Sequence, residues 1–425
     1  MSQFPLSAVR TTALYAQGLH TTPTGDPTPE RIYQLVQQLG CVQIDTLHLV
    51  RRSQYLVLWS RLGTYDPADF DRLIYQDRLL FEYWMHAACI IPLTEYRYLM
   101  HKMKANGNWW WGWADQPDNR PVVEQVRARV QQEGALRAAD FEYKRETKGT
   151  WWDWKPAKRA LEHLYNAGEL MIANRINFQR VYDLRERVLP DWVDQNEPDI
   201  DAARRHMIEL AARALGICHP AQLADYTHMK RGEAAPAVKA LIADGTLVEV
   251  EGELANGKNG ALIVHRDTLP ILERAADGAI RAERTTFLSP FDSLWWAQKR
   301  DEQFWNFMQR LEAYKPEPQR IWGYFCLAIL WRDQLVGRFD PKLERKTNTL
   351  RLKAIYLEPG IVPSDELVAD VAGALRDFMR FHDAQHLIIE RSDPAELGDR
   401  LLAAVSNGGG ELRFTNLNHL IKNSV

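Results

Sequence analysis

A carboxamide and a carboxylate lie two positions apart near the N-terminus, within residues 42–46. On an extended backbone, side chains at positions i and i+2 point to the same side, so Gln43 and Asp45 would share one face while Ile44 points inward. A carboxylate can accept a proton from water while a neighbouring amide fixes that water's orientation. We therefore take Asp45 and Gln43 as candidate catalytic residues. The pattern is short, and Asp45 could equally be the N-cap of a helix that follows it.

The segments around Asp45 predict a small unit of helices and a hairpin. Thr28–Leu39 has a helical pattern with Pro29 in its first turn, and Cys41–Ile44 is a short extended stretch. Asp45–Leu62 predicts a further helix, and Leu79–Pro92 predicts a β-hairpin. Asp45 would then lie where a short strand meets a helix.

A local pattern occurs twice further along the chain, at Leu161–Met171 and Val238–Val248. In each copy, apolar residues at helical spacing are followed by a glycine, Gly168 or Gly245, and then by an alternating strand. Each copy also has a shorter helical stretch upstream and a hairpin downstream. The upstream stretches are Ala135–Phe141 and His219–Tyr226, and the hairpins centre on Ile172–Tyr182 and Glu253–Gly260. This order of elements predicts two winged-helix units, and the first hundred residues predict a third, more divergent one.

Basic residues gather at two places that could contact DNA phosphates. Arg51 and Arg52 follow the Gln43/Asp45 pair, and a second group surrounds the predicted recognition helix and wing of the second unit. From these we take Arg51, Arg52, Lys155, Lys158, Arg159 and Arg180 as candidate DNA contacts. The alternative for both groups is an ordinary solvated surface.

The last third of the chain has a different pattern. Arg320–Trp331, Gln334–Asp340 and Leu350–Leu357 are apolar or alternating and predict strands of a small sheet or barrel. Asp365–Phe381 predicts an amphipathic helix, and His386–Glu390 one more strand. Linkers are expected near residues 190–201 and 276–285, where acidic, proline-containing or small-residue stretches interrupt the periodicity.

Composition excludes several classes of protein. The chain has 425 residues, a net charge of −3 and four well-separated cysteines, Cys41, Cys89, Cys218 and Cys326, so neither a disulfide framework nor a zinc site is expected. The sequence contains no long apolar run, signal-peptide pattern, phosphate-binding loop or metal-protease motif. We expect a cytoplasmic, nucleoid-associated monomer without cofactors or membrane association. Because the net charge is negative, DNA binding would depend on local basic faces of the surface.

Taken in order, several stretches resemble the AlkZ/YcaQ (AlkX)-like family of bacterial DNA glycosylases over nearly the whole length. The N-terminal ones are Gln43–Leu47, Arg52–Gly63, Glu82–His86, Trp151–Pro156 and Asn177–Leu184. The C-terminal ones are Leu288–Asp292, Gly323–Phe325 and Leu335–Asp340. Arg338 in the last stretch, and Lys342 just after it, are further candidate DNA contacts.

The resemblance implies an α+β fold of three tandem winged-helix domains followed by a C-terminal β-barrel domain. The corresponding domain limits are residues 1–110, 111–195, 196–284 and 285–425. It also implies monofunctional cleavage of the N-glycosidic bond of N7-alkylated guanine in double-stranded DNA, including unhooking of interstrand crosslinks. The family's catalytic motif falls on Gln43 and Asp45, in the aspartate-containing version typical of the YcaQ branch.

Two stretches depart from the family pattern. His86 is followed by Ala87 where the family usually has glutamate, and Trp296 is followed by Ala297 and Gln298 in place of aspartate and arginine. Loss of that charge pair would loosen a domain junction or alter a DNA contact.

A non-enzymatic winged-helix transcriptional regulator is the alternative reading of the chain. It accounts for the repeats and the basic helix, but not for the Gln43/Asp45 pair together with the long C-terminal module. A protein-interaction scaffold accounts for less, since winged helices serve that role mainly when the recognition helix lacks basic residues. Release of a base from alkylated DNA separates the glycosylase from both.

Overall fold

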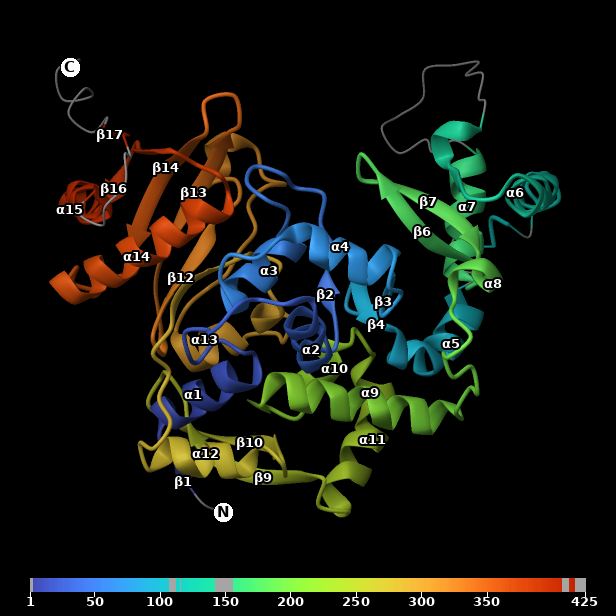
Figure 1. Ribbon diagram of the computed structural model, residues 1–425. Helices are drawn as coiled ribbons and strands as arrows, with labels where there is room; N and C mark the ends of the chain where they lie inside the picture. The colour runs from blue at the N-terminus through green and yellow to red at the C-terminus, as the bar shows by residue number, and fades with distance from the viewer. Residues whose placement is uncertain (1–2, 107–111, 115, 142–155, 407–412, 417–425) are drawn as a thin grey trace. The chain divides into compact units, whose positions relative to one another are not determined.

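The computed structural model describes the chain except for residues 1–2, 107–111, 115, 142–155, 407–412 and 417–425 (Figure 1). The chain divides into two compact units, Met1–Pro67 with Ile208–Val425, and Ala68–Met207. Both units contain helices and β-strands, so the predicted α+β class is confirmed. Among the described helices, none is both long and apolar enough to span a membrane.

The N-terminal part of the first unit carries the candidate catalytic segment. It consists of β1 (Gln3–Phe4), α1 (Leu6–Ala16), α2 (Pro29–Leu39), β2 (Val42–Gln43) and α3 (Ser53–Leu62). The start of α2 is as predicted, with Pro29 in the first turn and the Thr28 side chain accepting from the Arg31 amide at 3.4 Å. The prediction that a helix begins at Asp45 is wrong, because residues 44–52 are irregular and α3 begins at Ser53.

A group of helices and a hairpin covers residues 200–276, of which those from Ile208 onward belong to the first unit. Its elements are α9 (Ile200–Leu215), β8 (Ile217–Cys218), α10 (Gln222–Tyr226), α11 (Arg231–Ala243), β9 (Leu247–Glu253), β10 (Asn259–His265) and α12 (Leu269–Ala276). The strands form a sheet in the order β1-β9-β10-β8, in which β9 and β10 are the predicted hairpin. Gly245 follows α11 with φ 73°, the left-handed conformation that glycine adopts without a Cβ penalty. The repeated glycine pattern is therefore confirmed here.

The C-terminal part of the first unit is built on a second sheet. Its strands are β11 (Thr285–Leu288), β12 (Leu327–Trp331), β13 (Gln334–Glu344), β14 (Thr349–Leu357), β15 (His386–Ile389), β16 (Ser392–Asp393) and β17 (Arg413–Asn416). The order is β11-β12-β13-β14-β15-β17, with β16 paired to β14. In the described residues this order is an open path, so the predicted closed barrel is not confirmed. The strand expected over Arg320–Trp331 is β12 only from Leu327.

The helices α14 (Asp365–Phe381) and α15 (Ala395–Ser406) pack against this sheet, and α13 (Arg300–Trp305) lies beside α1 (Figure 1). Ser364 caps α14, and its side chain accepts from the Leu367 amide at 3.2 Å. The amphipathic helix predicted over Asp365–Phe381 is confirmed.

Aromatic packing joins α3 to this C-terminal sheet. Trp59 on α3 packs against Phe287 of β11 at 6.0 Å between ring centroids and against Phe378 of α14 at 5.0 Å. Phe287 in turn meets Phe339 of β13 edge-to-face at 4.7 Å. All four rings are buried. The helix that follows Asp45 is thus fixed on a hydrophobic core supplied by residues more than 200 positions away in the sequence.

The second unit contains two hairpins and several helices. The elements are α4 (Pro67–Tyr75), β3 (Leu80–Trp84), β4 (Ala88–Pro92), α5 (Tyr96–Asn106), α6 (Arg120–Glu133), β5 (Leu136–Arg137), α7 (Pro156–Asn166), β6 (Leu170–Ile176), β7 (Gln179–Leu184) and α8 (Arg185–Val188). The predicted hairpins are confirmed as β3–β4 and β6–β7. The helical stretch expected over Ala135–Phe141 is found only as a short 3-10 helix over Ala138–Asp140, because Leu136–Arg137 pairs with β7 as β5; the longer α-helix upstream of α7 is α6.

Candidate active site

Asp45 lies in the irregular segment 44–52, between β2 and α3, which we call the Asp45 loop. Its Oδ1 accepts a hydrogen bond from the Leu47 amide at 2.7 Å, a local turn closed by the side chain. The N-cap position of α3 is Arg52, seven positions further along the loop. Asp45 is therefore not the cap of the following helix, and this alternative reading of the residue is removed.

The environment of Asp45 suits a carboxylate that takes up a proton. The side chain is half-buried at the end of β2, where Gln43 is half-buried too. Burial raises the pKa of Asp45 above its ordinary value, while hydrogen bonding to the backbone amides of Leu47 and Thr46 acts in the opposite direction. A raised pKa makes the ionised carboxylate a stronger base than a fully solvated aspartate.

The main chain of the Asp45 loop is anchored from α3. Gln54 is only 3% exposed, and its Oε1 accepts from the Asp45 amide at 3.4 Å. Next to it, the fully buried Ser53 hydroxyl accepts from Ser289 at 3.0 Å. Near the end of α3, Arg61 forms a buried bidentate ion pair with Asp292, at 2.7 and 2.8 Å. The Leu288–Asp292 stretch, which is part of the family pattern, thus supports α3, the helix from which Gln54 anchors the Asp45 loop.

The C-terminal sheet also holds the loop through its backbone. Arg345 donates to the carbonyl oxygens of His48 and Val50, at 3.2 and 3.1 Å, and the Leu343 amide donates to the Leu49 oxygen at 2.8 Å. These tertiary hydrogen bonds occupy carbonyls that a helix would have used internally. They give the physical reason why no helix begins at Asp45.

Arginines make the surroundings of the loop electropositive. Burial and the charges of Arg52, Arg345 and Arg51 lower the pKa of His48 to about 4. His48 is therefore neutral at pH 7, and the positive charge comes from the arginines. Arg51 also donates to the Phe381 oxygen at 2.7 Å and to Asp383 at 3.1 Å. An electropositive surface beside a carboxylate suits a site that receives a polyanion.

Apart from Arg51 and Arg52 beside the loop, the predicted DNA contacts fall into three groups: exposed or half-buried side chains, a residue outside the described part of the chain, and arginines with acidic partners. Lys342 is exposed, and Lys158 and Arg159 on α7 are half-buried. Lys155 lies outside the described residues. Arg180 and Arg338 have acidic partners within the protein, Glu162 at 2.8 Å and Glu358 at 2.7 Å, and Arg338 is only 2% exposed. A phosphate would have to compete with those carboxylates for either arginine.

Sequence reasoning did not select Gln54 or Arg345. Gln54 is one residue inside a helix and lies in the Arg52–Gly63 stretch of the family pattern, but its residue type alone indicates no role. Arg345 belongs to a short basic run with Lys342 and Lys346, and this run was the available signal. Its role depends on β13 extending to Glu344, beyond the predicted end of that strand.

A family model described as DNA glycosylase AlkZ-like matches residues 36–381 of the sequence. The chain belongs to this family of AlkZ-like DNA glycosylases. The match includes Gln43, Asp45 and Arg345. The family-level resemblance inferred from the sequence is confirmed: the protein is a DNA glycosylase, a repair enzyme whose substrate is DNA. The transcriptional-regulator alternative is set aside.

The structure is also similar to a solved structure, that of Streptomyces sahachiroi DNA glycosylase AlkZ. The TM-score is 0.61 and the sequence identity 15%, with 92% of this chain and 100% of that chain covered. At that identity the similarity shows the fold alone. The two proteins therefore share one fold over the whole length of that relative.

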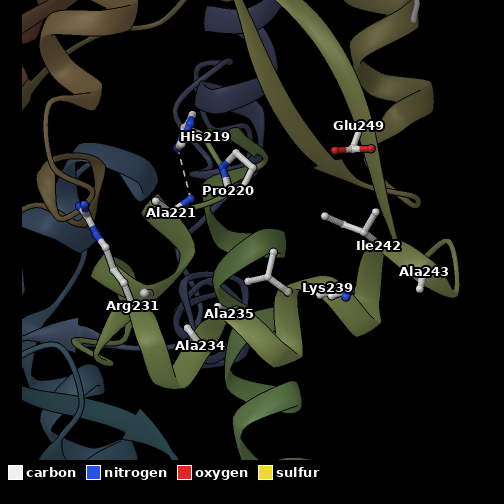
Figure 2. Close-up of a pocket in the computed structure, with 12 residues that line it drawn as sticks. His219, Pro220, Ala221, Arg231, Ala234, Ala235, Lys239, Ile242, Ala243 and Glu249 are labelled. Atoms are coloured by element: carbon white, nitrogen blue, oxygen red, sulfur yellow. Dashed lines mark hydrogen bonds between the residues drawn. The ribbon is translucent and has the colours of Figure 1, made fainter.

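A wide cavity of about 680 Å³ lies elsewhere in the first unit, against α10, α11 and β9 (Figure 2). Ala234, Ala235 and Lys239 line it along α11, and Glu249 lies on β9. Most of its lining is apolar, and it shares no residue with the Asp45 loop. Within the described part of the chain, no group of three or more His, Cys, Asp or Glu side chains is placed to hold a metal ion.

Proposed function

We propose that this AlkZ-like glycosylase releases N7-alkylated guanine from duplex DNA, with Asp45 as the catalytic carboxylate and Gln43 as a second anchor for the attacking water. The observation that carries the proposal is the position of Asp45. It is a half-buried carboxylate with a raised pKa, on a loop fixed by Gln54 and Arg345 and flanked by arginines. A residue that merely capped α3 would need neither a raised pKa, nor a fixed loop, nor neighbouring arginines.

The chemistry of the lesion matches a site with a single carboxylate. Alkylation at N7 places a positive charge on guanine, so the base leaves readily and needs little help from an acid. The difficult species is the cationic sugar that remains, which needs stabilisation and a water molecule delivered from one side. Ionised Asp45 would stabilise the cation electrostatically and accept the proton of that water. Gln43 would orient the water through its carboxamide.

We propose further that the enzyme unhooks interstrand crosslinks and is functionally closer to the YcaQ branch. A crosslinked base is tethered to the opposite strand and resists extrusion into a deep pocket, unlike the bases that many glycosylases flip. Asp45 on its loop and Gln43 at the end of β2 are both partly accessible. This accessibility supports an open site, and the aspartate at position 45 supports the branch.

We propose three winged-helix domains over residues 1–110, 111–195 and 196–284, with a sheet-based module over 285–425. The hairpins β3–β4, β6–β7 and β9–β10, each preceded by helices, support the count of three, whereas the compact units divide the chain at residue 67 and within α9. In this proposal Lys158, Arg159 and Lys342 contact phosphates, together with Arg51 and Arg52 beside the loop. We propose that the enzyme acts as a monomer on chromosomal DNA in the cytoplasm.

A duplex holding one N7-methylguanine tests the proposal directly. After incubation with excess enzyme, alkaline treatment should cleave the strand at the lesion, whereas the unmodified duplex should stay intact. A second duplex with an N7-linked interstrand crosslink should yield separable strands. Absence of cleavage at N7-methylguanine, under conditions where the protein binds the duplex, would show that the lesion assignment is wrong.

A further inference from the structure

A second, smaller pocket lies on the C-terminal sheet module and has a different character from the cavity at α11. Its volume is about 280 Å³, and it lies between the segment 317–324, the strands β13 and β14, and Arg391 in the connection between β15 and β16. Three cationic side chains line it: Arg320, Lys353 and Arg391. None of them belongs to the Asp45 loop.

The wall of this pocket is held firmly by two carboxylates. Glu312 is 2% exposed and accepts from the amides of Ile321, Trp322 and Gly323, at 2.9, 2.8 and 3.4 Å. Asp340 is 3% exposed and accepts from the amides of Tyr324 and Phe325, at 2.9 and 3.1 Å. Backbone donors thus satisfy both carboxylates, and the segment between them is fixed in place.

The charges that the pocket presents are mainly positive. Its three cations face two carboxylates, Glu317 and Asp340, and the Asp340 charge is already engaged by backbone amides. Arg320 donates through Nε to the Lys315 oxygen at 2.9 Å, and Arg391 donates to the Tyr356 hydroxyl. Because a guanidinium has five N–H donors, these bonds orient each arginine and leave donors for an anion.

Aromatic rings line the same pocket. Trp322 and Tyr324 contribute to its wall and are half-buried. Arg338 stacks over the Trp322 ring at 4.6 Å, and Tyr356 meets that ring edge-to-face at 5.2 Å. These contacts fix the orientation of the indole before any ligand arrives. Fixed rings beside cations are the combination with which proteins bind the base and the phosphate of an unpaired nucleotide.

We propose that this pocket binds one unpaired nucleotide unit, with its phosphate among Arg320, Lys353 and Arg391 and its base against Trp322 or Tyr324. The volume, about 280 Å³, is near the lower end of the range for small-molecule pockets and is of the size of a single nucleotide unit. Either a single-stranded stretch of DNA or a free nucleoside monophosphate supplies this chemistry. The site is independent of Asp45 and of the proposed lesion.

Fluorescence anisotropy with a labelled thymidine pentanucleotide and the full-length protein tests the site. Arg391→Ala and Lys353→Ala should each weaken binding by about tenfold, the effect of losing a charge-assisted hydrogen bond. Replacement of the ring that the base contacts, in Trp322→Leu or in Tyr324→Leu, should weaken it, and Tyr324→Phe should preserve it, because the ring is retained. The matched control is Arg380→Ala, which removes an exposed arginine on α14 of the same module and should change nothing. Unchanged affinity in the Arg391 and Lys353 variants, or an equal loss in Arg380→Ala, would overturn the proposal.

Competition separates the sources of the ligand. Displacement of the probe by thymidine monophosphate at equal concentration would assign the site to free nucleotides, whereas displacement only by longer single strands would assign it to DNA. Inorganic phosphate that competes as well as thymidine monophosphate would show that no base is recognised and would overturn the site as stated. Asp45→Asn should bind the probe like the wild type, so failure of the active-site assignment would leave this result intact.

Discussion

Arg345, at the end of β13, donates a hydrogen bond to the backbone oxygen of His48, 297 positions earlier in the sequence, at 3.2 Å. The same guanidinium nitrogen reaches the Val50 oxygen at 3.1 Å. One side chain of the C-terminal sheet therefore fixes the backbone of the loop that carries Asp45. Under the proposed function, this contact makes the C-terminal module responsible for positioning the loop of the candidate catalytic carboxylate.

The first prediction concerns Arg345 as a positioning residue. Arg345→Ala should slow base release at saturating enzyme by about tenfold to a hundredfold, because small displacements of reacting groups are costly. Arg345→Lys should recover part of the rate. Lys346→Ala removes an equal charge from the next, exposed position and is the matched control. It should weaken DNA binding without slowing the saturated rate, and an equal slowing in both variants would show that charge alone matters.

The second prediction concerns the buried pair of Arg61 and Asp292, whose side chains are 1% and 0% exposed. Asp292→Ala leaves the guanidinium buried without its carboxylate and should lower the free energy of unfolding by about 3–5 kcal/mol. Urea denaturation measures the change. Asp377→Ala breaks the exposed pair with Arg380 and should cost less than about 1 kcal/mol. A similar small loss in both variants would mean that the buried pair does not fix α3.

Local sequence patterns predicted the elements that depend on local chemistry. Thr28 and Pro29 predicted the start of α2, Gly168 and Gly245 predicted the ends of two helices, and alternation predicted the hairpins. Each of these signals acts within a few residues, where backbone sterics and capping decide the outcome.

The errors arose where distant contacts decide the local structure. The helix predicted from Asp45 does not form over residues 45–52, because Arg345 and Leu343 donate to the loop carbonyls. Leu136–Arg137 looked helical, but the pair joins β7. The candidate pair Gln43 and Asp45 was visible from its residue types, whereas the anchors Gln54 and Arg345 were not, since their roles exist only in three dimensions.

Gln298 illustrates the same point at a position that departs from the family pattern. Other contacts replace the charge pair that the family pattern has here. The backbone amide of Gln298 donates to Asp225 at 3.1 Å, and its side-chain oxygen accepts from Arg231 at 3.1 Å. Its backbone oxygen accepts from Gln222 at 3.0 Å. The segment after Asp292 therefore keeps polar contacts with α10 and α11.

The third prediction separates a DNA contact from an internal ion pair. Lys158→Ala should weaken duplex binding similarly for all sequences and reduce the salt slope by about one. Arg180→Ala should instead destabilise the fold, because Glu162 is 6% exposed and would lose its partner at 2.8 Å. Binding titrations at several salt concentrations and thermal unfolding distinguish the two. A stable Arg180→Ala protein with a reduced salt slope would assign Arg180 to DNA.

The fourth prediction follows from the raised pKa of Asp45. Catalysis requires the ionised carboxylate, so base release should be constant at higher pH and fall as the pH drops through the pKa of Asp45. The midpoint should lie above about 3.9, the ordinary value for aspartate. His48, with a pKa of about 4, is neutral through the active range, so His48→Gln should keep the same profile. A profile that shifts with His48→Gln would assign the titration to the histidine.

The last prediction concerns the two candidate catalytic side chains themselves. Asp45→Asn keeps the size of the side chain and an oxygen that can accept from the Leu47 amide, so the loop and its anchors should remain. The charge that stabilises the sugar cation and takes the proton is lost. General-base assistance contributes about 10²–10⁴-fold, so single-turnover release of N7-methylguanine should fall by that order while duplex binding is retained. Gln43→Ala should lose less, because it affects only the orientation of the water. Asp45→Asn that releases the base at the wild-type rate would return Asp45 to a structural role, the closing of its own turn.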